Sequence, residues 1–298
     1  MSSQRRAEIL LVSVTIIWGS TFVITKDILE ASTPFFYTGI RFSLAAAIVL
    51  VLFFRRMVKI PASTIRKGSI LGSFLFVGFI LQTVGLQYTT ASKSAFFTGL
   101  LVVLTPIVHI GVQHALRLEN KPLKIGNLLG VICAAIGLYL LTSPTGAQFN
   151  IGDALSIGCA LCFAFYIVYL DSCSGEPDKL QLTFVQFALC GILGFLAGVV
   201  FEHPRIGTSS GFIAELLYLT IFATVITMWI QNRFQGDTTP TRAAVIFALE
   251  PVVAAILGYV VRGEVLGIAG IIGGAIILAG LLVSEFSESV PLLRKTFT

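Results

Sequence analysis

Apolar residues dominate ten stretches of this chain, and most charged residues lie in the short segments between them. A helix needs roughly 20 apolar residues to cross the hydrocarbon core of a bilayer, and each stretch is about that long. The pattern therefore predicts an all-α membrane protein. The ten expected transmembrane helices lie at about residues 8–29, 33–54, 67–88, 92–115, 124–142, 151–170, 180–200, 211–232, 240–262 and 266–285.

Polar side chains inside several of these stretches recur three, four or seven residues apart, which places them on one face of a helix. The fourth stretch carries Thr98, Thr105 and His109 in this way, and the eighth carries Thr227 and Gln231. Two interpretations stay open for such stripes. Hydroxyl and amide groups bond to neighbouring helices or to their own backbone, or they line a polar pathway through the membrane.

Composition and charge agree with the membrane assignment. Of the 298 residues, 56% are hydrophobic and 12% are charged, whereas soluble domains carry about 25% charged residues. Fifteen of the 20 Lys and Arg residues fall in segments that share a side with both ends of the chain, and four fall on the other side. This asymmetry predicts cytoplasmic amino and carboxyl ends in the cytoplasmic or inner membrane. The net charge of +5 is thereby a topology signal, and no nucleic-acid partner is expected.

The sequence also repeats itself with an offset of 145 residues. "TGIRFSLAA" from Thr38 is followed by "TFVQFALCG" from Thr183, and Pro106 corresponds to Pro251. The chain thus divides into a first five-helix repeat, 1–145, and a second, 146–298. Five crossings leave the second repeat starting on the opposite side of the membrane, so equivalent helices are expected to run in opposite directions. Inverted repeats with a central substrate cavity are a recurring plan of secondary transporters.

Three ionisable residues lie deep in predicted spans: Arg41, Glu250 and His109. A charge at the bilayer centre costs at least about 2.5–3.5 kcal/mol, so each should have a partner or face water. Arg41 is either a buried counter-charge or a ligand for a substrate carboxylate. Glu250 either pairs with Arg41 or serves a proton or a substrate ammonium. His109 is expected to be a hydrogen-bonding residue in a helix interface, with titration in the pathway as the alternative.

Several short motifs, in this order and spacing, resemble the drug/metabolite transporter superfamily, and in particular its EamA-type ten-span exporters, which include bacterial amino-acid exporters. They are "WGSTFVITK" in the first span, the arginine of the second, "LTP" in the fourth, "ALEP" in the ninth and "RGE" after it. The resemblance covers nearly the whole chain and implies two repeats around a central cavity. Together with the polar stripes it yields these expected cavity residues: Trp18, Thr21, Arg41, Gln82, Thr98, Thr105, His109, Phe163, Tyr166, Thr227, Gln231 and Glu250.

The expected activity is secondary export of amino acids or similar amphipathic metabolites by alternating access. One alternative is an antiporter of phosphorylated sugars or nucleotide-sugars, although such ligands would require more cations within the membrane than Arg41. Another is proton-coupled drug efflux. No HExxH, GxSxG or P-loop motif is present, so neither an enzyme nor an ATP-driven pump is expected. The predicted partners are a small-molecule substrate, membrane lipid and, as a candidate coupling ion, the proton; no cofactor or metal is expected, and the oligomeric state is not predicted.

Overall fold

Helices contain nearly all of the residues that the computed structural model describes, namely 3–116, 124–142, 149–262 and 267–286. In chain order they are α1 (Ser3–Ala31), α2 (Pro34–Leu52), α3 (Phe54–Met57), α4 (Ala62–Tyr88), α5 (Ala91–Gly99), α6 (Leu101–Leu116), α7 (Ile125–Thr142), α8 (Ile151–Ser172), α9 (Lys179–Phe201), α10 (Ser210–Thr220), the π-helix η1 (Ile221–Ile226), α11 (Thr227–Phe234), the 3-10 turn η2 (Gln235–Asp237), α12 (Pro240–Phe247), α13 (Glu250–Arg262) and α14 (Ile268–Phe286).

Eight of the helical segments are long and apolar enough to cross a membrane, and two shorter apolar helices, 125–141 and 268–284, complete the ten expected spans. Large apolar side chains remain exposed on the outside of the bundle; Val199, Val200 and Phe201, for example, are 70–75% exposed. In a bilayer these side chains would contact lipid. The chain is a multi-pass, all-helical membrane protein. Residues Gly263 and Glu264 of the "RGE" motif and the junction between the repeats at 143–148 lie outside the described residues.

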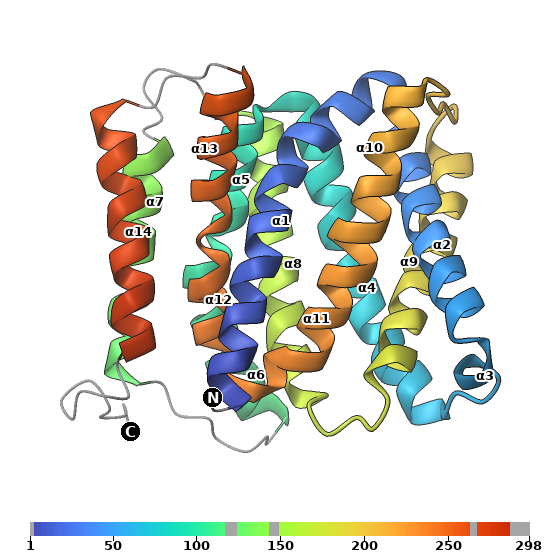
Figure 1. Ribbon diagram of the computed structural model, residues 1–298, viewed down its shortest axis with the longest axis horizontal. Helices are drawn as coiled ribbons and strands as arrows, with labels where there is room; N and C mark the ends of the chain where they lie inside the picture. Colours follow the sequence, from blue (N-terminus) through green and yellow to red (C-terminus); the bar gives the residue numbers. More distant parts are fainter. Residues whose placement is uncertain (1–2, 117–123, 143–148, 263–266, 287–298) are drawn as a thin grey trace.

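Equivalent helices of the two halves run in opposite directions, as the odd number of spans requires. In Figure 1, α1 rises from the lower face and α8 descends from the upper face. We call these the lower face, where α1 begins and α14 ends, and the upper face, where α8 begins. The arrangement has the form of an inverted repeat.

Glycines show how closely the equivalent helices approach. A Cβ added to Gly137 would lie 2.5 Å from the carbonyl oxygen of Gly273, and one added to Gly130 would lie 3.0 Å from that of Gly280. Because α7 and α14 are antiparallel, the two contacts involve equivalent glycines in opposite order: Gly137 meets Gly273, and Gly130 meets Gly280. The fifth helices of the two repeats therefore meet through small residues that permit direct backbone contact.

Gly273→Ala is expected to destabilise the packing of α14 on α7. The added methyl would lie 2.3 Å from the Leu141 nitrogen and 2.4 Å from the Gly137 oxygen, so the helices must separate. A cost of roughly 1–3 kcal/mol is typical of overpacking and should lower the melting temperature of the detergent-solubilised protein. The control is Gly111→Ala, where an added Cβ has no neighbour within 4 Å. An unchanged melting temperature for Gly273→Ala would contradict this close packing.

The fourth and ninth spans are broken, which the hydrophobic pattern did not predict. The fourth consists of α5 and α6, separated at Leu100, and the ninth consists of α12 and α13, separated at 248–249. The proline of the ninth span, Pro251, thus lies in the first turn of a new helix, where the missing N–H costs nothing. Pro106 instead lies inside α6. Both breaks adjoin the centre of the bundle, and broken helices at this depth are typical of transporter substrate sites.

Candidate functional site

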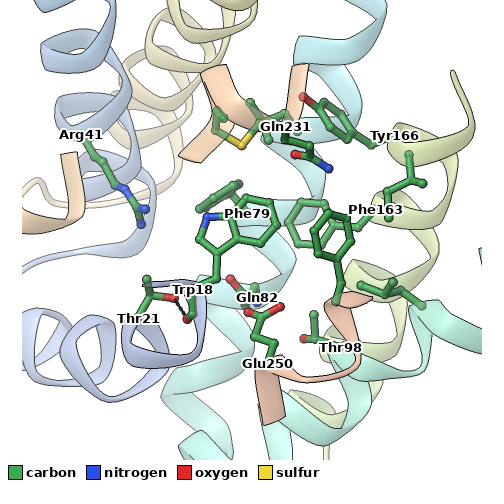
Figure 2. Close-up of a pocket in the computed structure, with 15 residues that line it drawn as sticks. Trp18, Thr21, Arg41, Phe79, Gln82, Thr98, Phe163, Tyr166, Gln231 and Glu250 are labelled. Atoms are coloured by element: carbon green, nitrogen blue, oxygen red, sulfur yellow. Dashed lines mark hydrogen bonds between the residues drawn. The ribbon is translucent and has the colours of Figure 1, made fainter. Parts of the chain in front are cut away.

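The two repeats surround a central cavity with about 570 Å³ of empty space, part of which is open to solvent. Both broken spans contribute to its wall, through Thr98 and Leu101 on either side of the first break and through Phe247 and Glu250 on either side of the second. Trp18 and Phe163, which the repeat makes equivalent, line it from α1 and α8 and lie on opposite sides of it in Figure 2. Residues from both halves therefore share a single site.

Most of the residues expected from the sequence meet in this cavity. The nine that line it are Trp18, Thr21, Arg41, Gln82, Thr98, Phe163, Tyr166, Gln231 and Glu250. The other three, Thr105, His109 and Thr227, do not line it. Their presence on a polar helix face did not determine whether that face meets the cavity or another helix.

Each of the three residues outside the cavity is buried among helices. The hydroxyl of Thr105 donates a 2.7 Å hydrogen bond to the carbonyl of Leu101 in its own helix. His109 is only 3% exposed within α6. Thr227 lies behind the indole of Trp18 and accepts a 3.1 Å hydrogen bond from it. Thr105 and Thr227 follow the interpretation in which polar groups bond within and between helices.

The remaining wall of the cavity is apolar and was not anticipated. It consists of Leu75, Phe79, Leu101, Ile167, Met228 and Phe247. Two signals were available: Phe79 precedes Gln82 by three residues, and Met228 precedes Gln231 by three, so each shares a helix face with a residue that was predicted. Apolar residues are so frequent in this chain that their helical spacing alone did not distinguish cavity from core.

The π-helix η1 positions two of the cavity residues. The carbonyl of Ala223 accepts hydrogen bonds from Nε1 of Trp18 at 3.2 Å and from Nη2 of Arg41 at 3.4 Å. A π-turn shifts backbone carbonyls out of the regular α-helical hydrogen-bond pattern, and such turns are frequent at functional sites. The side chains of α1 and α2 are thus anchored to the same turn of the eighth span.

Arg41 is bonded mainly to the protein. Its side chain is 3% exposed, Nε donates to Thr224 at 2.8 Å and Nη1 donates to the Tyr37 hydroxyl at 3.0 Å. The guanidinium carbon also lies 5.1 Å from the ring centre of Phe79, within the range of a cation–π contact. Arg41 and Glu250 form no ion pair among the described residues. Arg41 therefore has a structural role at the cavity wall, with its remaining N–H groups as possible donors to a ligand.

Arg41→Gln should destabilise the protein, because it leaves the Tyr37 hydroxyl and the η1 carbonyl without their donors. Loss of hydrogen bonds to a buried charged group typically costs about 1.5–3 kcal/mol each, although glutamine restores part of the bonding. We expect a lower melting temperature of the purified protein. The equivalent Gln186→Ala provides a comparison, since Gln186 is also fully buried and lies 2.8 Å from the Tyr166 hydroxyl. A melting temperature equal to wild type for Arg41→Gln would show that these bonds contribute nothing to stability.

Among the residues that the structure describes, Glu250 is the only acidic one that lines the cavity. Its carboxylate points into the space beside Trp18 in Figure 2, and it makes no hydrogen bond or ion pair within the described part of the chain. It is the first residue of α13, where the positive end of the helix dipole favours a negative charge. The side chain has no partner among the described residues, so Glu250 is available to a cation or a proton.

Tyr166 borders the cavity through a polar cluster on the side of the lower face. Its hydroxyl lies 2.8 Å from both Gln186 and Asn232, and the Asn232 amide donates to Thr183 at 2.8 Å. These side chains come from α8, α9 and α11, so the cluster fixes three helices of the second repeat around the tyrosine.

Among the described residues, no three His, Cys, Asp or Glu side chains are close enough to hold a metal ion.

Comparison with known proteins places the chain in a family. Residues 5–143 and 150–286 each match the EamA-like transporter family. An uncharacterized transporter of Archaeoglobus fulgidus is 33% identical over 277 residues, which are 93% of this chain and 85% of that protein. A probable amino-acid metabolite efflux pump of Salmonella typhimurium is 27% identical over 96% of this chain and 97% of its own length.

A solved crystal structure has the same fold, with a TM-score of 0.76 over 94% of this chain and 96% of that one, at 17% sequence identity. The two matched segments correspond to the two halves of the bundle, and the central cavity lies between them. The chain belongs to the EamA-like transporter family.

Proposed function

We propose that this transporter exports amino acids or closely related amphipathic amines from the cytoplasm by alternating access. The observation that carries the proposal is the unpaired carboxylate of Glu250 in a cavity whose other walls are mainly aromatic and aliphatic. A carboxylate in such surroundings favours a ligand with an ammonium group, because few other groups could compensate it away from water.

The aromatic walls favour an apolar substituent beside that ammonium. Trp18 and Phe163 lie on opposite sides of the space, and Phe79 forms an edge contact with Phe163 at 5.7 Å between ring centres. Arg41 lies on the far side of Trp18 from Glu250 in Figure 2. Its N–H groups that have no protein partner could donate to a ligand carboxylate. The name of the Salmonella relative supports the same class of substrate.

The two alternatives differ in the charges that they need. A phosphorylated sugar or nucleotide-sugar carries at least two negative charges, yet the cavity offers Arg41 as its one cation and Glu250 as an opposing charge. These cavity charges disfavour an antiporter of phosphorylated sugars or nucleotide-sugars. Proton-coupled efflux of a hydrophobic cation would use Glu250 but would not need Arg41.

The excess of Lys and Arg on the side of both chain ends supports cytoplasmic termini, with the lower face toward the cytoplasm.

The test is uptake by proteoliposomes of four matched ligands, with and without a pH gradient: phenylalanine, phenethylamine, N-acetylphenylalanine and a hexose phosphate. We expect saturable transport of phenylalanine and little transport of the N-acetyl compound, which lacks the ammonium. Equal transport of phenethylamine and phenylalanine would instead favour the cation-efflux alternative. Transport of the hexose phosphate alone would overturn the proposed substrate class.

A further inference from the structure

Two buried ion pairs lie at opposite ends of the bundle. Near the lower face, Glu8 of α1 and Arg242 of α12 form an ion pair with 2.6 Å between Oε1 and Nε, and the two side chains are 5% and 4% exposed. Near the upper face, Asp153 of α8 accepts from Lys93 of α5, also at 2.6 Å, and these side chains are 0% and 18% exposed.

The two ion pairs have the same design, with a carboxylate on the first helix of one half and a cation at the start of a broken span of the other. Glu8 and Asp153 are separated by the repeat offset of 145 residues. The cations come from similar segments, "TTASK" at 89–93 and "TTPTR" at 238–242, which are 149 residues apart, four more than the repeat offset. In each segment the second threonine caps the helix, and the first reaches the carboxylate, Thr89 at 2.7 Å from Asp153 and Thr238 at 3.4 Å from Glu8.

Each ion pair joins the two repeats. The carboxylate belongs to the first helix of one half, and the cation belongs to the first part of the broken span of the other half. Residues that line the cavity follow each carboxylate by ten positions, Trp18 after Glu8 and Phe163 after Asp153. At 1.5 Å per residue, each carboxylate lies about 15 Å along its helix from the cavity.

The cation of each ion pair also lies on a short helix that ends at the cavity. Lys93 is on the short helix α5, which ends beside the lining residue Thr98, and Arg242 is on α12, which ends at the lining residue Phe247. Both short helices are separated from the rest of their span by a break. A ligand that contacts the break can therefore tilt the short helix and move the cation at its other end.

We propose that Glu8–Arg242 and Asp153–Lys93 are the two gate latches of this transporter, and that each half-cycle breaks one while the other stays formed. Separation of Glu8 from Arg242 opens the cavity to the lower face, and separation of Asp153 from Lys93 opens it to the upper face. The water that enters an opened vestibule solvates the freed charges, which lowers the cost of breaking a buried pair. The proposal relies on the chain being a transporter but not on the identity of its substrate.

The test measures access to the cavity from each side. The reporter is Thr21→Cys, at a lining position, in a variant whose five native cysteines are replaced by alanine or serine. A membrane-impermeant maleimide is added to intact cells or to inside-out vesicles. Glu8→Gln should shift labelling toward the lower face, and Asp153→Asn should shift it toward the upper face, each by about tenfold in the ratio between the two sides. The opposite directions of the shifts are diagnostic, whichever face is cytoplasmic.

The matched control is Glu176→Gln. Glu176 also joins the two halves near the lower face, through Lys67 at 2.9 Å and the hydroxyl of Thr64, but it has no counterpart in the other repeat. The Glu176→Gln variant should leave the labelling ratio unchanged. If Glu8→Gln fails to fold because Arg242 is left without its counter-charge, the double variant Glu8→Gln/Arg242→Gln removes both charges. Shifts in the same direction for both latches, no shift, or an equal shift for Glu176→Gln would overturn the proposal.

Discussion

Replacing Glu250 with glutamine is expected to reduce transport of ammonium-bearing substrates by about 10- to 100-fold. The estimate follows from the loss of one charge-assisted hydrogen bond, about 1.5–3 kcal/mol, at the only carboxylate that lines the cavity. The amide has nearly the same shape, so the cavity wall should remain intact. The measurement is the initial rate of uptake by proteoliposomes, for wild type and variant, over the pH range around neutrality.

The pH profile separates two roles of this carboxylate. If Glu250 carries a coupled proton, wild-type transport changes with pH and the variant loses that dependence, because glutamine does not titrate. If Glu250 only binds the ammonium group, the variant is slower but keeps the profile of wild type. Glu250→Asp preserves the charge on a shorter side chain and should retain more activity than Glu250→Gln. An unchanged rate together with an unchanged profile in Glu250→Gln would remove this residue from the mechanism.

Trp18→Ala should produce the other large effect, a loss of transport of at least about tenfold, since truncating a well-packed aromatic anchor in a binding site costs about 2 kcal/mol or more. The indole contributes the ring that faces the cavity and the N–H that bonds to η1. It also packs against Phe247 at the end of α12, with 5.4 Å between ring centres. Uptake kinetics of the wild type and the variant, with the folded fraction checked by size-exclusion chromatography, measure the effect.

Trp18→Phe is the matched comparison, because the second repeat already has phenylalanine at the equivalent position, Phe163. This variant keeps a ring against the ligand and loses the hydrogen bonds to Ala223 and Thr227. If the ring matters most, Trp18→Phe should transport at close to the wild-type rate. If anchoring to η1 matters most, it should resemble Trp18→Ala. Wild-type kinetics in Trp18→Ala would show that the residue is packing only.

The broken fourth and ninth spans are central to both the proposed function and the proposed latches. Each break adjoins the cavity, and each short helix connects it to a cation near one face. In Figure 1, α12 and α13 continue one another next to α1. A ligand bound between the breaks would contact both moving segments, so its binding could bias which latch is open.

The sequence by itself determined the membrane class, the ten spans and their inverted duplication. These features can be predicted from the sequence because the bilayer imposes a fixed length of apolar helix and because an odd number of crossings reverses the second repeat. The repeat also placed Trp18 opposite Phe163, and the cost of intramembrane charge drew attention to Arg41 and Glu250.

Only the tertiary structure decided which polar stripes meet the cavity. Thr98 and Thr105 are seven residues apart and were expected to share a face, but the break at Leu100 separates their helices, so Thr98 lines the cavity while Thr105 bonds to its own backbone. The π-turn of η1, which anchors Arg41 and Trp18, likewise has no signature in a periodicity of 3.6 residues. The pairing of Glu8 with Arg242 joins residues more than 200 positions apart. Local sequence determines which residues can form helices, whereas helix breaks and long-range partners depend on how ten helices pack at once.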